Sequence, residues 1–203
     1  MADFKDLTGI HIEGHIHIHD PVEKVTYVNK RNAIHYENMS VSLAESLTNS
    51  GKGFVYSMAF GNGGTAIDPT GIITYLTPNT TGVNASLYNQ TYSKVVNNNS
   101  STNLDPSRNF IETRHTTGNN YTDIFVTCLL DYGEPSGQTA YDTTTSTGAA
   151  FVFDELGLQG LNADGSTSLL THVIFHPVLK SLNRLIQIDY TVRIQSLTGL
   201  VSV

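Results

Sequence analysis

Polar and apolar residues alternate without interruption near the N-terminus of the sequence. The polar positions are His11, Glu13, His15, His17 and His19. Side chains of a β-strand point to opposite faces with a period of two residues, so these five groups would share one face of a strand. Isoleucines and one glycine occupy the positions between them. The pattern predicts an amphipathic strand with an apolar face and a histidine face.

Closely spaced imidazoles raise the question of metal binding. His15, His17 and His19 would follow one another at about 6.5–7 Å along the strand, and imidazole is a ligand for Zn, Fe, Ni and Cu. Two rings could share one ion. In a trimer with this strand at the axis, a His-x-His pair from each chain would give six nitrogen ligands. A role as a proton switch is also open, because imidazole titrates near neutral pH.

The sequence around these histidines does not supply the rest of a metal site. Zinc sites usually combine ligands from several elements and include carboxylates or cysteines, and no second ligand cluster is evident. We therefore interpret His15, His17 and His19 as a solvated or interface face and assign no metal ligand. Metal binding remains the alternative.

Three further features could do chemistry, and each favours a structural role. Cys128 lies in an apolar run and is expected to be a core residue. The glycine-rich stretch 61–65 lacks the Gly-Lys-Ser/Thr ending of a phosphate-binding loop and is expected to be a tight turn. Asp154 and Glu155 are adjacent, so a regular strand would direct them to opposite sides. The sequence has no Gly-x-Ser-x-Gly elbow. We expect no catalytic residue, no cofactor and no enzyme activity.

Composition narrows the class of protein. The chain has 203 residues, of which 14% are charged, and its formal net charge is −7. Only 11 residues are Lys or Arg, against 18 Asp or Glu, which argues against direct recognition of nucleic acid. No apolar stretch approaches the length of a membrane span, and no signal peptide is evident. With a single cysteine, no disulfide can form within the chain, and we expect synthesis in a reducing cytoplasm.

The remaining pattern predicts a mainly β protein. We expect an antiparallel β-sandwich with one packed α-helix, an N-terminal β-hairpin and long polar loops. Residues 1–31 would form an N-terminal arm and the histidine hairpin, and residues 32–203 the sandwich domain. The helix is expected over residues 33–49, with Asn32 as its N-cap. Its apolar stripe would consist of Tyr36, Met39, Leu43 and Leu47.

Two polar stretches lack periodicity. Residues 77–120 are expected to form an extended excursion that orders fully only against a neighbour, and residues 135–148 have the same character. Strands should dominate the last third of the chain, where β-branched and aromatic residues recur between turns.

Two segments resemble virion structural proteins of tailed bacteriophages. The first runs over residues 31–75 and places Met-Ala-Phe-Gly-Asn-Gly-Gly-Thr at residues 58–65, after a helix and a strand. The second runs over residues 153–178 and precedes a long final strand. This order is similar to that of β-rich phage proteins of the neck, baseplate and fibre-attachment regions. The histidine strand and the asparagine-rich loop lie outside the resemblance.

The resemblance implies a structural subunit that forms an oligomeric ring at the neck or collar, where head and tail connect. Its partners would be copies of itself and neighbouring virion proteins such as a connector, a tail terminator or fibres. It would reside in the virion after synthesis in the host cytoplasm. The alternative within the virion is a baseplate, fibre-attachment or capsid decoration protein. A carbohydrate-binding β-sandwich is a third hypothesis, separate from the resemblance, and the absence of Trp weakens it.

Overall fold

The computed structural model describes residues 9–48, 50–82, 85–135 and 150–197. These parts of the chain contain twelve strands and one helix. They are β1 (Gly9–His19), β2 (Thr26–Ile34), α1 (Tyr36–Leu47), β3 (Val55–Gly61), β4 (Thr65–Ile67), β5 (Ile73–Tyr75), β6 (Gln90–Val95), β7 (Phe110–Arg114), β8 (Tyr121–Leu130), β9 (Ala150–Leu161), β10 (Thr167–Leu169), β11 (Thr171–Ser181) and β12 (Ile186–Leu197). The predicted mainly β class with a single helix is confirmed.

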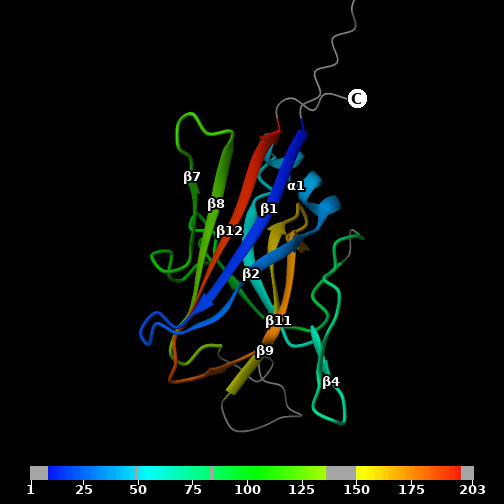
Figure 1. The fold of residues 1–203 in the computed structure, drawn as a ribbon. Coiled ribbons are helices and arrows are strands. Elements are labelled where there is room, and N and C mark those ends of the chain that lie inside the picture. The colour runs from blue at the N-terminus through cyan, green and yellow to red at the C-terminus, as the bar shows by residue number, and fades with distance from the viewer. Residues whose placement is uncertain (1–8, 49, 83–84, 136–149, 198–203) are drawn as a thin grey trace, which may run out of the picture.

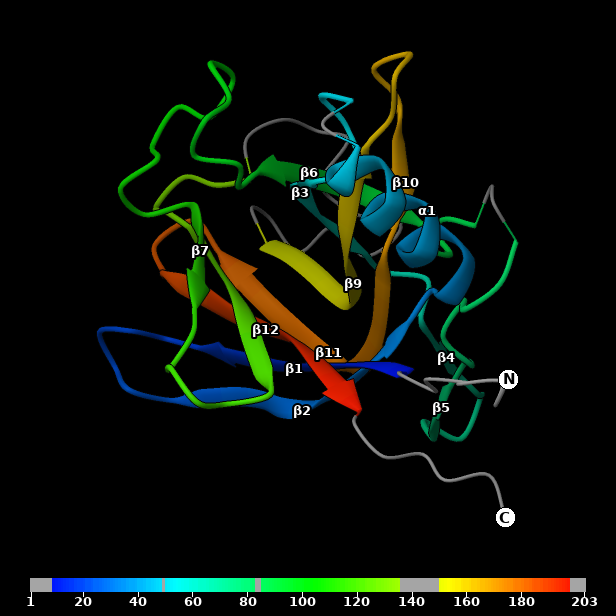
Figure 2. The ribbon, with the colours of Figure 1, turned by 90° about the horizontal axis from the view of Figure 1, so that it is seen from above.

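The strands form a curled antiparallel sheet whose two halves face each other as a sandwich. One half has the order β2-β1-β12-β8-β7, and the other has the order β6-β3-β9-β11, with β10 also paired to β9. Only two residue pairs of β2 and β11, Thr171 with Ile34 and His172 with Ala33, join the halves along the sheet. Figure 1 shows the first half from its outer side, and Figure 2 shows the two layers from above.

A single large apolar core fills the space between the halves. Ile16, Ile18, Ile188 and Tyr190 come from the first half, and all four are fully buried. The second half contributes an aromatic cluster, Phe60, Phe151, Phe153 and Phe175, in which the ring centroid of Phe153 lies 5.4–5.7 Å from those of the other three. Edge-to-face and offset contacts at this spacing are favourable beyond the area that they bury.

The histidine hairpin is part of this sandwich. β1 lies in the interior of its half, paired with β2 on one side and with β12 along all eleven of its residues on the other. The predicted boundary between residues 31 and 32 falls inside β2, which continues to Ile34. Asp20 closes the hairpin turn because its Oδ1 accepts the backbone N–H groups of Val22 and Glu23 at 2.8 and 2.9 Å.

The helix begins later than predicted because β2 occupies residues 32–34. His35 is its N-cap in place of Asn32, and its Nδ1 accepts the backbone N–H of Asn38 at 3.2 Å. Met39 packs with Ile34 and Leu170 at one end of the sandwich, as predicted for the apolar stripe. The two ends of that stripe, Tyr36 and Leu47, are instead 72% and 87% exposed.

The polar excursion 77–120 contains two strands that its sequence did not indicate. β6 pairs with β3 at the edge of one half, and β7 pairs with β8 at the edge of the other. The expected excursion that orders only against a neighbour is corrected for these two segments, because they pair with strands of the same chain. Both strands lie at sheet edges, where one side of a strand makes no ladder and polar sequence is tolerated. Most of the second polar stretch, from residue 136 on, lies outside the described residues.

Candidate functional site

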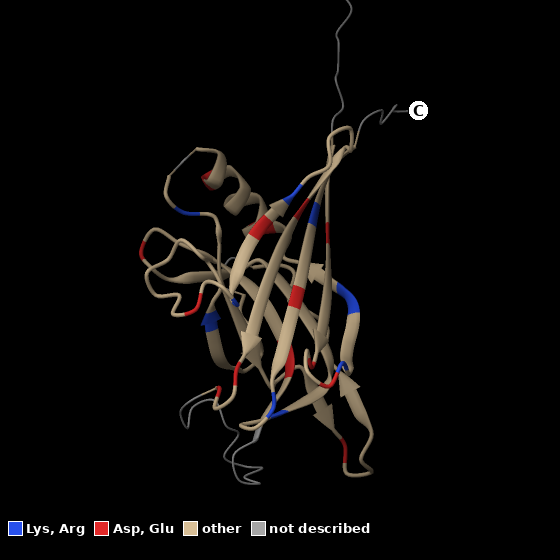
Figure 3. Cartoon of the chain, turned by 90° about the vertical axis from the view of Figure 1, so that its left-hand side faces the viewer, with Lys and Arg blue, Asp and Glu red and all other residues tan. Residues whose placement is uncertain are grey.

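The histidine face lies on the outer side of the β2-β1-β12-β8-β7 half. Ile16 and Ile18 are fully buried, whereas His15 is exposed and His17 and His19 are half-buried. This confirms the predicted division of the strand into an apolar and a histidine face. Positions of both charge signs are interspersed along the strands and loops of the side of the molecule shown in Figure 3.

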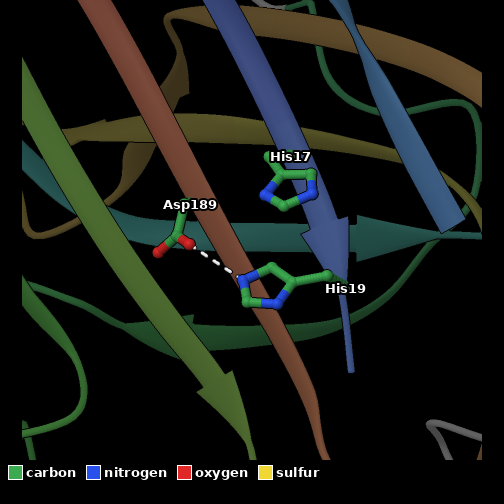
Figure 4. A group of neighbouring side chains, drawn as sticks. All are labelled: His17, His19 and Asp189. Carbon is green, nitrogen blue, oxygen red and sulfur yellow. Dashed lines mark hydrogen bonds and ion pairs between the residues drawn. The ribbon is translucent and has the colours of Figure 1, made fainter. Parts of the chain in front are cut away.

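A carboxylate from the far end of the sequence completes a cluster with two of these histidines. Asp189 of β12 lies opposite His17 in the β1–β12 register. Its Oδ2 accepts a hydrogen bond from His19 Nε2 at 2.9 Å. One ligand atom from each of His17, His19 and Asp189 lies within 4.8 Å of the other two. Figure 4 shows the three side chains converging above the strands that carry them.

Neighbouring groups fix the orientation of the carboxylate. Asp189 Oδ1 accepts hydrogen bonds from Thr127 Oγ1 at 3.1 Å and from Gln187 Nε2 at 2.9 Å. Gln187 Nε2 also donates to Oδ2, at 3.1 Å. Together these donors fix the carboxylate with Oδ2 directed at His19.

The two imidazoles are also ordered. His17 and His19 stack with ring centroids 4.5 Å apart and an angle of 10° between the rings. His17 Nε2 lies 3.0 Å from Thr26 Oγ1 of β2. Burial, and then the proximity of His19, lower the pKa of His17 despite the opposing effect of Asp189. The neutral ring is therefore favoured at neutral pH. His15 is not a member of the cluster.

A second polar cluster is buried beneath the glycine-rich turn. The Glu155 carboxylate accepts backbone N–H groups of Gly63, Tyr88 and Asn89 at 2.8–3.1 Å. It also accepts His172 Nε2–H at 3.0 Å. His172 Nδ1 in turn accepts the backbone N–H of Asn79 at 2.9 Å. Both side chains are fully buried.

Asp154 supports the same turn. Its two oxygens accept the backbone N–H groups of Gly64 and Thr65, each at 2.9 Å, and the Thr65 hydroxyl also donates to it. Burial raises the pKa of Asp154 although these hydrogen bonds oppose the shift. Burial acts in the same direction on Glu155, but its hydrogen bonds, led by that from His172, lower the pKa of this carboxyl.

The expectation that Asp154 and Glu155 point to opposite sides is wrong. Phe151 and Phe153 face the core at odd positions, but Leu156 and Leu158 face it at even positions. The alternation therefore changes phase between residues 153 and 156, where the pairing of β9 with β11 is irregular between Ile174 and Val178. Both carboxylates consequently lie outside the apolar core and bind the same turn. Their partners are backbone groups and buried side chains, an arrangement that supports the loop structure.

The structure confirms the expectations for Cys128 and for the glycine-rich stretch 61–65. Cys128 is fully buried in the core, as predicted, and burial raises the pKa of its thiol to about 12. The glycine-rich stretch is a turn leading from β3 to β4, also as predicted. The thiolate is the reactive form of cysteine, so the raised pKa disfavours reaction at Cys128.

An arm projects from the sandwich after this turn. β4 and β5 form a separate two-stranded sheet, seen at the lower right of Figure 1. Four large apolar side chains of the arm and its end are exposed: Ile67 by 66%, Ile72 by 61%, Tyr75 by 54% and Leu76 by 41%. We refer to residues 65–76 as the β4–β5 arm.

The sequence matches no known family, no curated protein and no solved structure. Within the described residues, no helix has the length and apolar character needed to cross a bilayer.

The sequence did not indicate Asp189 or His172 as members of polar clusters. Asp189 lies on the polar side of an alternating strand, which was a usable signal. Its position beside His17 depends on the pairing of strands that lie at opposite ends of the sequence. His172 follows an apolar segment and carries no local mark of its role.

Proposed function

We propose that the protein is a structural subunit of a tailed-phage virion that assembles into a ring at the neck or collar. The β4–β5 arm is the observation that carries this proposal. The phage resemblance of residues 31–75 and 153–178 supports the virion context. The proposal assigns no reaction and no cofactor.

The arm has the features of a contact between subunits. Contiguous exposed apolar side chains on a soluble protein mark interaction surfaces. The side chains of Ile67, Ile72 and Tyr75 are exposed and belong to none of the apolar clusters formed by the described residues. Covering them with a neighbouring subunit would remove this apolar area from water.

The base of the arm is firmly held. Leu76 N–H donates to Gly64 O at 2.9 Å, and Asp154 binds Thr65 at the start of β4. Tyr75 Oη lies 3.4 Å from His176 Nδ1 of β11. An arm anchored in this way presents its apolar residues in a fixed direction. A directed head-to-tail contact repeated between identical chains closes into a ring when its rotation allows.

The test is the mass of the assembly formed by the untagged protein, measured by native mass spectrometry and light scattering. We expect a closed ring of identical subunits. Ile67→Glu should dissociate it, because the new charge would be buried at the contact. Val22→Glu is the matched control: Val22 is 65% exposed, like Ile67, but lies in the β1–β2 turn away from the arm.

A wild-type protein that is monomeric at high concentration would contradict the ring proposal. If Val22→Glu dissociated the ring as much as Ile67→Glu does, the subunit contact could not be assigned to the β4–β5 arm. A trimer that depends on the arm would favour the alternative placement in a baseplate, a fibre attachment or a capsid decoration.

A further inference from the structure

We propose that His17, His19 and Asp189 of one chain form a binding site for a divalent first-row transition metal ion, with Zn²⁺ as the representative ion. The inference is independent of the ring and of the β4–β5 arm. It requires no second copy of the chain, unlike a trimeric arrangement of His-x-His pairs.

The distances suit a single ion. Zinc binds imidazole nitrogen at about 2.0–2.1 Å and carboxylate oxygen at about 2.0–2.2 Å, so two ligands of one tetrahedral ion lie about 3.3 Å apart. His19 Nε2 and Asp189 Oδ2 are already 2.9 Å apart, and the three ligand atoms lie within 4.8 Å of one another. The rings of His17 and His19 are stacked with 10° between their planes, so at least one ring must turn out of the stack for all three atoms to bind one ion.

Two of the three ligands, His17 and Asp189, have partners outside the cluster that would orient them. With Nε2 of His17 directed to Thr26 Oγ1, its Nδ1 is the nitrogen on the side of Asp189. Thr127 Oγ1 donates to Oδ1 of Asp189, and Gln187 Nε2 lies 2.9 Å from Oδ1 and 3.1 Å from Oδ2, so that both groups hold the carboxylate in place. Such hydrogen bonds to the ligands are a regular feature of metal sites and fix ring orientation and tautomer.

Binding at His19 has a simple proton balance. In the metal-free state the Nε2–H proton lies between His19 and Asp189. The metal ion takes the place of this proton, which moves to Nδ1 through solvent, so that the Nε2 lone pair becomes a ligand. The side chains of His19 and Asp189 are 18% and 20% exposed, which allows water to complete the coordination.

The donor set selects the class of ion. Two imidazoles and one carboxylate are typical of zinc and non-haem iron sites, whereas Mg²⁺ and Ca²⁺ prefer oxygen ligands alone. The ion would connect β1 to β12 near the closed end of the hairpin.

The experiment measures Zn²⁺ binding to untagged protein by isothermal titration calorimetry and elemental analysis after dialysis. We expect one ion per chain. His17→Gln, His19→Gln and Asp189→Asn should each weaken binding by about 10-fold or more, and Thr127→Val by about 10-fold. His15→Gln is the matched control, because His15 shares the strand and face but not the cluster, and it should leave the affinity unchanged.

X-ray absorption spectroscopy of the zinc-loaded wild-type protein provides a reading that does not depend on variants. Two imidazole ligands per ion are expected. Three or more imidazole ligands would mean that His15 or a second chain also binds the ion, which would overturn the proposal. It would equally be overturned by absence of stoichiometric zinc, by unchanged affinity in folded Asp189→Asn, or by equal losses in His15→Gln and His19→Gln.

Discussion

The imidazole of His172 donates a hydrogen bond from Nε2 to Oε2 of Glu155 over 3.0 Å, and neither side chain is accessible to solvent. Seventeen residues separate the two along the chain. Their contact is the centre of a network that ties the glycine-rich turn, the segment around Tyr88 and the strand β11 together. A buried carboxylate with four donors is a structural support whose loss should be measurable.

Glu155→Gln should lower the free energy of unfolding by about 2–4 kcal/mol, because an amide replaces an acceptor-only group and its NH₂ then faces backbone donors. The urea midpoint should fall without a change in m-value. Glu112→Gln, on an exposed edge strand, is the control and should have little effect. Equal stability of the Glu155→Gln variant and the wild type would refute this role for the carboxylate.

The same carboxylate makes a defined contribution to acid sensitivity. Because the folded-state pKa of Glu155 lies below its ordinary value of 4.5, its stabilisation is present above about pH 4.5 and is lost as the pH falls through the folded pKa. Asp154 acts in the opposite direction, since its pKa is raised. The stability difference between wild type and Glu155→Gln should therefore shrink on acidification. Denaturant curves at successive pH values test this, and a difference that grows would contradict it.

Lys180 should influence stability at alkaline pH. The residue is buried, and its ammonium group donates to the backbone oxygens of Asp131 and Ser181 at 3.0 and 2.9 Å. Burial lowers the pKa of Lys180 to about 8 from 10.5. The unfolded chain then binds more protons between these pH values, so the contribution of Lys180 to stability rises with pH, by at most about 1.4 kcal/mol per unit.

The comparison for this prediction is Lys180→Met, which keeps a similar shape without a titrating group. The stability of the wild type relative to this variant should increase from about pH 8 to about pH 10.5. A difference that stays constant across this range would show that Lys180 does not titrate there.

Two glycines of β9 should respond differently to the same substitution. A Cβ at Gly157 would lie 2.2 Å from the backbone oxygen of Thr171, whereas the contacts of a Cβ at Gly160 begin at 3.4 Å. Gly157→Ala should destabilise the protein by about 1–3 kcal/mol because backbone must move. Gly160→Ala should be close to neutral. Thermal unfolding of the two variants measures the contrast, which would be absent if β9 shifted freely against β11.

The features that were predicted correctly depend on patterns among residues that are close together in the sequence. Uninterrupted alternation identified β1 and its two faces, and β-branched and aromatic residues between turns indicated the strands of the last third of the chain. The single helix followed from a change of period, although its start was displaced because β-pairing of residues 32–34 prevailed over the capping preference of Asn32. Cys128 was placed in the core because its neighbours are apolar.

What could not be predicted depends on partners that are distant in the chain. Asp189 joins His17 only through the register of β1 with β12, which no local pattern specifies. The change of phase at Asp154 arises from the irregular pairing with β11. β6 and β7 are short edge strands whose polar sequence gave no period, and only the strands beside them define their conformation.

The full pairing of β1 with β12 has a consequence for synthesis. The ribosome makes β1 first, and its partner emerges some 170 residues later. Until β12 is made, one edge of β1 has no hydrogen-bonding partner strand, and its isoleucine face is not covered. Unpaired strand edges of this kind promote association between nascent chains. Expression of chains that stop before β12 should therefore give insoluble material, and chaperones that shield an open strand edge should assist the full-length protein during translation.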